Sequence, residues 1–424
     1  MQKKILDDLE ELLAENVIDK TTAENIQRFY QDRSLEARNR QYIIFGILGS
    51  LLIGLGIILI VAHNWDNLNR LSKTVIGFLP LVLSQVLGVL TLVRWRASRT
   101  WRESAATLLV LGLGATLSLI SQIYHIPGSM ASFVLTWMLL ILPVMYLFPS
   151  TMAAVFYLIG VTYHGIETGY NGGTSAEKYY YWIFLLPLIP HYLFLLRNQA
   201  KSNFTYLLNW LIPISILINL GTISNHNAEW LFATYMLLLG IYYLMGKNVA
   251  PFTNSLQNNG FRTLGSIGMV VLLITLSFQW IWKEMRQATL NFFSVEAVVT
   301  FALLIVCTGL IFRFRRTDKR GINLDPSPYI PILFLVLFLA TRSIPVLPIV
   351  VINVTLFALA LYTIRRAMQL QHLGLLNYGL LMITALIICR FFDTNISFIL
   401  RGLLFVLIGI GFFIANYRMI KTSP

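Results

Sequence analysis

The chain has 424 residues, of which 57% are hydrophobic and only 12% are charged. Soluble globular proteins carry about 25% charged residues, so this composition excludes an ordinary soluble protein. The net charge of +13 does not by itself indicate nucleic acid. The basic residues lie in short loops between apolar runs and form no separate basic domain, so we predict no nucleic-acid partner.

Residues 1–41 are the one segment polar enough to lie outside a bilayer. Apolar side chains recur at helical spacing between Ile5 and Leu13, and the tetrapeptide TTAE at 21–24 matches a capping box that starts a second helix. We therefore predict a cytoplasmic amphipathic helical hairpin. Two short helices bury little apolar surface by themselves, so we expect residues 1–40 to dock on the membrane domain or on a protein partner.

Residues 42–424 are predicted to form an all-α, polytopic transmembrane bundle in contact with the lipid bilayer. About twenty mainly apolar residues cross the hydrocarbon core as a helix. Fourteen apolar runs approach that length, although 151–163 and 328–343 follow tight proline-containing turns and either cross the bilayer or re-enter it. The predicted spans are 42–62, 75–93, 105–123, 131–148, 151–163, 180–196, 204–221, 229–245, 263–282, 294–312, 328–343, 346–364, 373–390 and 398–417.

Lysine and arginine are distributed unequally between the two sides of this bundle. If residues 1–41 are cytoplasmic, the inner segments hold 24 of the 32 basic residues and the outer loops hold 7. Cytoplasmic loops of membrane proteins are enriched in these residues. The distribution therefore predicts that the N- and C-termini are both cytoplasmic.

Two stretches, about 75–148 and 343–417, look like copies of each other. Leu79-Pro80 in the first corresponds to Leu347-Pro348 in the second, and each proline is followed five residues later by an amide, Gln85 or Asn353. A parallel internal repeat is typical of some transporters, in which kinked helices line a substrate site near the bilayer midplane. Gln85 and Asn353 are therefore candidates for such a site, or else they make interhelical hydrogen bonds.

Histidines and carboxylates gather at the predicted outer ends of the spans. Three histidines have an acidic residue three positions later, which places both side chains on one face if the backbone is helical. A carboxylate beside an imidazole suits proton relay or general base catalysis, but both residues are also ordinary in solvated interfacial loops. No known metal signature is matched, so neither a metal nor a cofactor is predicted. The pairs are His63 with Asp66, His164 with Glu167, and His226 with Glu229.

Arg390, Asp393 and Arg401 lie near the predicted outer ends of two successive spans. Two arginines on adjacent antiparallel helices resemble a clamp for a lipid or another small anionic ligand. Alternatively, the arginines reach the interface with their charged ends or pair with Asp393 structurally. Gln122, Tyr124 and His125, at another outer span end, complete the candidate polar site on the outer face.

Several blocks resemble a bacterial membrane family known as domain of unknown function 2157. They are the amphipathic N-terminal segment, the 52–81 stretch containing His63-Asn64-Trp65-Asp66, the pentapeptide SQIYH at 121–125, the tetrapeptide RFFD at 390–393, and the RGLLF run at 401–405. The resemblance covers residues 1–165 and 373–417. It implies a multi-pass protein of the bacterial inner (cytoplasmic) membrane and brings no activity with it. The family more often has a small residue at the position of His63, which argues against a catalytic histidine there.

Three functions fit these features, and they leave catalytic residues unknown. A transporter or lipid-linked flippase fits the parallel repeat, the proline-kinked spans and the short loops. A scaffold or assembly factor would bind its partners through residues 1–40. A membrane-embedded transferase would use the histidine–carboxylate pairs at the outer face.

Overall fold

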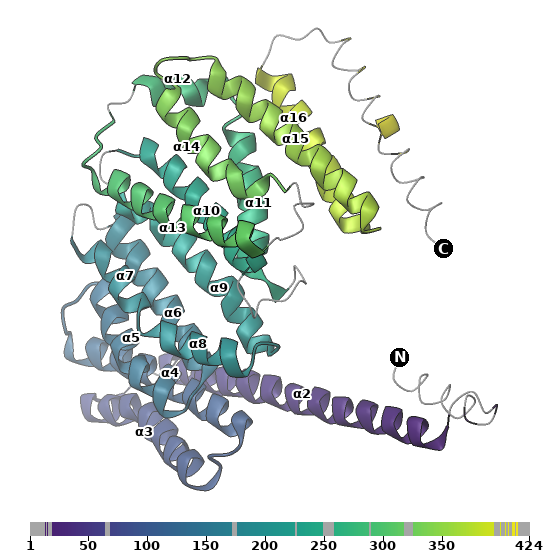
Figure 1. Ribbon diagram of the computed structural model, residues 1–424. Helices are drawn as coiled ribbons and strands as arrows, with labels where there is room; N and C mark the ends of the chain where they lie inside the picture. The colour runs from purple at the N-terminus through teal and green to yellow at the C-terminus, as the bar shows by residue number, and fades with distance from the viewer. Residues whose placement is uncertain are drawn as a thin grey trace. The chain divides into compact units, whose positions relative to one another are not determined.

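The computed structural model describes residues 19–63, 68–171, 176–224, 227–248, 258–287, 290–317 and 325–393, with a few single positions before and after these ranges. Within these ranges all regular structure is helical, and no strand is present (Figure 1). The prediction of an all-α membrane protein is confirmed. The chain divides into two compact units, Met1–His164 and Gly165–Pro424.

The N-terminal unit is built around α4. α4 packs against α2, α3 and α5, and small residues let the backbones approach. A Cβ atom at Gly112 of α4 would lie only 2.9 Å from the carbonyl oxygen of Pro80 in α3, so only glycine fits this crossing. The helices are α2 (Lys20–His63), α3 (Arg70–Arg94), α4 (Arg99–Tyr124), α5 (Met130–Leu147) and α6 (Thr151–Ile166), which ends at the boundary between the units.

α2 is a single helix of 44 residues. At 1.5 Å per residue it is about 66 Å long, roughly twice the thickness of a hydrocarbon core. It begins at Lys20, where the carboxylate of Asp19 accepts hydrogen bonds from the hydroxyls of Thr21 and Thr22. The predicted second helix of the hairpin and the predicted first span are therefore parts of one helix, with no break near residue 41. The predicted first helix of the hairpin lies almost entirely outside the described residues.

The C-terminal unit contains the remaining helices. Its π-helical and 3₁₀ segments are η2 (Glu167–Asn171), η3 (Ala176–Tyr179), η4 (Gly221–Ile223) and η6 (Ser327–Tyr329). Its α-helices are α7 (Tyr180–Leu185), α8 (Leu188–Asn198), α9 (Asn203–Leu220), α10 (Glu229–Asn248), α11 (Gly260–Thr275), α12 (Gln279–Gln287), α13 (Val295–Thr317), α14 (Ile330–Ala340), α15 (Leu347–Gln369) and α16 (Leu373–Asp393).

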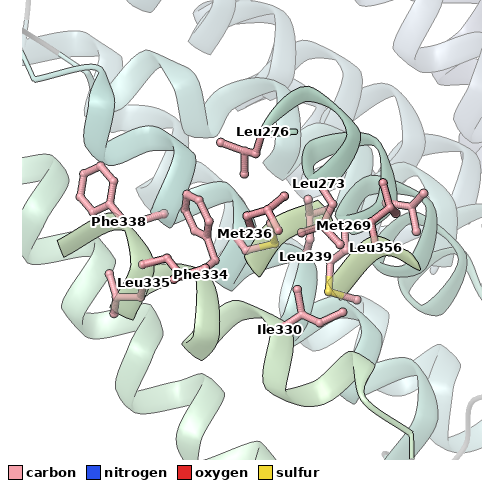
Figure 2. Close-up of a cluster of buried hydrophobic side chains, with 14 of the residues drawn as sticks. Met236, Leu239, Met269, Leu273, Leu276, Ile330, Phe334, Leu335, Phe338 and Leu356 are labelled. Carbon is pink, nitrogen blue, oxygen red and sulfur yellow. The ribbon is translucent and has the colours of Figure 1, made fainter. Parts of the chain in front are cut away.

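α10 lies at the centre of this unit, packed against α11, α13 and α14. Among the candidate spans in the described ranges it has the lowest mean hydropathy, 1.2, and it is also the most buried. The two facts agree, because a helix surrounded by protein does not need a lipid-like surface. Figure 2 shows Met236 and Leu239 of α10 close to Met269 and Leu273 of α11 and to Phe334 of α14, all within one apolar cluster.

The chain bends by 83° between α11 and α12. In α12 the side chains of Ile281, Trp282 and Met285 are buried, whereas Lys283 and Glu284 on the other face are exposed. A short helix with one apolar and one charged face is typical of the membrane interface. The apolar run predicted as one span, 263–282, is therefore broken: α11 ends at Thr275 and α12 leaves in another direction.

Nine helices in the described ranges are long and apolar enough to cross a membrane, or ten if the bent pair α11–α12 forms one span. The predicted count of fourteen is not confirmed. Two of the missing spans are those with proline-containing turns. α6 has 16 residues and α14 has 11, both shorter than the roughly twenty that a crossing needs. The predicted span 398–417 lies mostly outside the described residues, as does the end of the second repeat copy.

Candidate functional site

The histidine–carboxylate pairs are only partly within the described residues. The side chain of His63, and both Asp66 and His226, lie outside them. His164 is buried in the last turn of α6, with 1% of its surface exposed. Glu167 begins the following π-helical turn, and its carboxylate accepts a hydrogen bond from the Asn171 side-chain amide at 3.1 Å. Glu229 lies in the first turn of α10. A cluster at the predicted outer face stays a prediction.

Tyr124 and His125 form the end of α4. His125 adopts a left-handed conformation (φ 52°) and is the C-cap, and its N–H bonds to the carbonyl of Gln122 at 3.4 Å. The Tyr124 hydroxyl lies 3.3 Å from the Thr74 hydroxyl of α3, and the guanidinium of Arg70 lies over the Tyr124 ring at 4.7 Å. These contacts join the ends of α3 and α4, so the local geometry of this block is that of a helix cap.

Arg390 and Asn353 meet at the bend between α11 and α12. The Arg390 guanidinium donates to the carbonyl oxygen of Ser277, and its Nη2 lies 3.3 Å from the Ser277 hydroxyl. The side-chain amide of Asn353 lies 3.5 Å from the same carbonyl and 2.7 Å from that of Ile349 in its own helix. A break in a helix leaves carbonyls without their usual partners, and these two side chains supply donors. The Asp393 side chain and Arg401 lie outside the described residues.

Gln85 and Asn353 belong to different units, so each is considered by itself. Gln85 is exposed on the surface of α3 in the N-terminal unit. Asn353 is partly buried beside the bend just described. Neither residue lines the cavities found among the described residues, and the predicted midplane site stays a prediction.

The C-terminal unit contains a cavity of about 340 Å³ between α11, α15 and α16. These helices lie side by side in Figure 1. One part of the lining consists of basic, hydroxyl and phenolic side chains, and the other part is aliphatic. The lining residues are Tyr243, Arg262, Thr263, Ser266, Ile267, Met269, Val270, Ser327, Leu359, Tyr362, Thr363, Arg366, His372, Gly374, Leu375, Tyr378 and Met382.

The basic residues gather because the C-terminal ends of some helices and the N-terminal ends of others meet there. Lys247 lies in the last turn of α10, Arg262 in the first turn of α11, and Arg366 in the last turn of α15; His372 directly precedes α16. Consecutive antiparallel helices place the end of one and the start of the next at the same side of a bundle. This is the side that the charge distribution predicts to be cytoplasmic. The aliphatic lining, for example Val270, lies further along the helices, about 12 Å deeper at 1.5 Å per residue.

A buried carboxylate stabilises the polar end of the cavity. Asp325 is 2% exposed, and its Oδ2 accepts from the Lys247 ammonium and from the Tyr243 hydroxyl, both at 2.5 Å. Its Oδ1 accepts from the Ser327 backbone N–H at 3.1 Å. Burial alone would raise the pKa of the Asp325 carboxyl, but the Lys247 charge and the hydrogen bonds from Lys247, Tyr243 and Ser327 together lower it. Tyr243 and Ser327 connect this ion pair to the cavity wall.

Arg262 and Arg366 remain available on the cavity side. Arg366 donates from Nη1 to the Tyr362 hydroxyl at 2.8 Å, which fixes its position. The described residues contain two ion pairs, Arg99–Glu103 and Lys247–Asp325, so neither cavity arginine has a carboxylate within 4.0 Å among them. The Nδ1 atom of His372 accepts from the Leu375 N–H at 3.1 Å, so a neutral ring has its proton on Nε2.

Sequence reasoning assigned Lys247, Arg262 and Arg366 to membrane orientation alone. One signal could have revealed the cavity. Tyrosines lie within the predicted spans close to these basic residues, at 243, 362 and 378. Tyrosine is also common at the membrane interface, so this signal becomes specific only in combination with the basic residues about one turn away.

The comparisons with known proteins bear on the N-terminal part of the chain. Residues 10–154 match a family described as Predicted membrane protein (DUF2157). The resemblance to this family is confirmed over that range, and the cavity in the C-terminal unit lies beyond it. No curated protein and no solved structure matches the chain. The match and the apolar helices agree that this is a multi-pass membrane protein in contact with the bilayer.

Proposed function

We propose that the protein is a transporter or lipid flippase, and that its C-terminal unit takes an amphiphilic molecule into the cavity between α11, α15 and α16. The cavity supports this proposal most directly. Its volume of about 340 Å³ falls within the range of small-molecule sites. Its polar end lies where helices begin and end, and its apolar end lies further along the same helices.

The broken helix supports the same proposal. Discontinuous helices in membrane proteins occur where non-helical backbone lines a cavity or is buried in protein, and in transporters they form substrate and ion sites. Here the break between α11 and α12 lies at Ser277, and Arg390 and Asn353 from α16 and α15 contact it. The same three helices, α11, α15 and α16, line the cavity, so the break belongs to the group of helices that forms it.

The cavity favours this proposal over an enzyme or a scaffold. Among the described residues one carboxylate, Asp325, lies beside the cavity, and Lys247, Tyr243 and Ser327 hold it. A carboxylate so engaged is a poor general base. A scaffold needs docking surfaces rather than an interior cavity with a polar and an apolar end.

The experiment is a translocation assay on the full chain in liposomes, with fluorescent phosphatidylglycerol and phosphatidylcholine as probes. Ser266 lines the cavity on α11, whereas Val271 on the same helix is exposed at the helix surface. We expect Ser266→Phe to reduce probe movement at least tenfold and Val271→Phe to leave it unchanged, with both variants folded by thermal unfolding. If neither probe moves with the native chain, or if Ser266→Phe moves them as fast as the native chain, the proposal is wrong.

A further inference from the structure

We propose that the cavity selects an amphiphile whose phosphate headgroup carries a net negative charge, and that Arg262 and Arg366 bind this headgroup at the polar end. This inference rests on the proposed uptake of an amphiphile and specifies its chemical class. It places the anion at the side of the molecule opposite to the outer face that the sequence favoured.

The charge balance of the polar end, counted over the described residues, is positive and favours an anion. Arg262, Arg366 and Lys247 supply three positive charges, and Asp325 supplies one negative charge. Asp325 lies 2.5 Å from Lys247 and neutralises it. The two arginines are both half-buried, and both are close enough to Lys247 for their charges to repel it. Uncompensated charges near the membrane interior are unfavourable unless they face a ligand or water.

The donors at this end suit phosphate. A guanidinium presents planar pairs of N–H groups that match phosphate oxygens, which makes arginine a preferred ligand for this group. The bond to the Tyr362 hydroxyl uses one donor of Arg366 and fixes the rest. In its neutral form the His372 ring would offer a further N–H from Nε2, because Nδ1 already accepts from Leu375.

The aliphatic lining favours an anion that belongs to an amphiphile. Ile267 and Val270 of α11, Leu359 of α15 and Met382 of α16 line the cavity beyond the polar end. Free phosphate would leave this surface without a partner, whereas an acyl chain would cover it. The volume suits a headgroup and the first part of a chain, and the rest of the chain would extend into the bilayer.

The test is a binding titration of the full chain in detergent. The probes are phosphatidylglycerol, phosphatidylcholine and inorganic phosphate, and the readouts are lipid retention by mass spectrometry and the shift in unfolding temperature. The variants are Arg262→Gln and Arg366→Gln. The matched control is Arg365→Gln, because Arg365 is the exposed neighbour of Arg366 and does not line the cavity.

We expect phosphatidylglycerol to bind at least tenfold more tightly than phosphatidylcholine and inorganic phosphate. Each cavity variant should weaken phosphatidylglycerol about tenfold, and Arg365→Gln should not change it. Because Arg366 also bonds Tyr362, Arg262→Gln alone is decisive if Arg366→Gln fails to fold. Equal affinity for both lipids, lost in Ser266→Phe, would overturn the inference of a net anionic headgroup and leave the uptake of an amphiphile standing. Phosphate binding as tightly as phosphatidylglycerol would show a site for a free anion and overturn it as well.

Discussion

Glu103 in the N-terminal unit and Asp325 in the C-terminal unit are both buried carboxylates near a helix end, with 1% and 2% of their surfaces exposed. The partners differ. Glu103 accepts from the Ser150 hydroxyl at 2.6 Å and from the backbone N–H groups of Thr151 and Met152 at 3.1 and 3.0 Å. These groups belong to the start of α6, where unpaired N–H groups and the helix dipole favour a negative charge.

Asp325 is neutralised by side chains from a different helix, namely Lys247 and Tyr243, whereas the ion pair of Glu103 is with Arg99 of its own helix at 4.0 Å. At Glu103 the backbone completes the set of partners, and the result is a joint between α4 and α6. At Asp325 the partners stand beside a cavity with two further arginines. The comparison teaches that a buried charge indicates a binding region when the surrounding charges do not balance, and a structural joint when they do.

The largest expected effect is the loss of the Asp325 charge. Asp325→Ala leaves the Lys247 ammonium buried without a counter-ion, which typically costs about 3–5 kcal/mol. We expect a fall in unfolding temperature, measured on the purified protein in detergent. The double variant Asp325→Ala/Lys247→Met removes both charges and should recover much of the loss. If the losses of stability in Asp325→Ala and Lys247→Met add up to the loss in the double variant, the two residues do not interact directly.

A smaller loss is expected at the joint between α4 and α6. Glu103→Gln keeps an oxygen acceptor but removes the negative charge that faces the start of α6, so we expect a loss of about 1–2 kcal/mol. Thermal unfolding measures it. The control is Glu24→Gln, since Glu24 is exposed on α2. If both variants unfold alike, Glu103 does not stabilise the joint.

The pH dependence of the unfolding free energy should reveal the contribution of the Lys247–Asp325 ion pair. The pKa of Asp325 is lowered from its ordinary value of 3.8, so the unfolded chain binds this proton more readily than the folded one. Its stabilising contribution is therefore present above about pH 4 and is lost as the pH falls below that value. We expect native stability, measured by unfolding between pH 3 and 7, to fall more steeply at the acid end than that of Asp325→Asn. If the stabilities of the native protein and of Asp325→Asn fall in parallel as the pH is lowered, Asp325 does not make this contribution.

The sequence predicted the helical class and most of the helices, because runs of about twenty apolar residues have few alternatives in a membrane. The sequence prediction was incomplete where contacts between distant parts of the chain determine the structure. The run 263–282 reads as one span, but Arg390 and Asn353, more than seventy residues later, stabilise a break at Ser277. The cavity was missed for a related reason: Arg262 and Arg366 are distant in sequence, and only the pairing of helices brings them to one cavity.

The smallest expected effect distinguishes a cap from a catalytic group at His125. A histidine at φ 52° is strained relative to glycine, so His125→Gly should stabilise α4 by about 0.5–1 kcal/mol. His125→Val should destabilise it, because a branched side chain is worst in this conformation. Unfolding temperatures measure both changes, and the translocation assay of the same variants gives the second readout. If stability decreases from glycine to histidine to valine at position 125 and translocation is unchanged, the role of His125 is structural. If His125→Gly is stabilised but no longer translocates the probes, His125 would instead belong to a functional site at the predicted outer face.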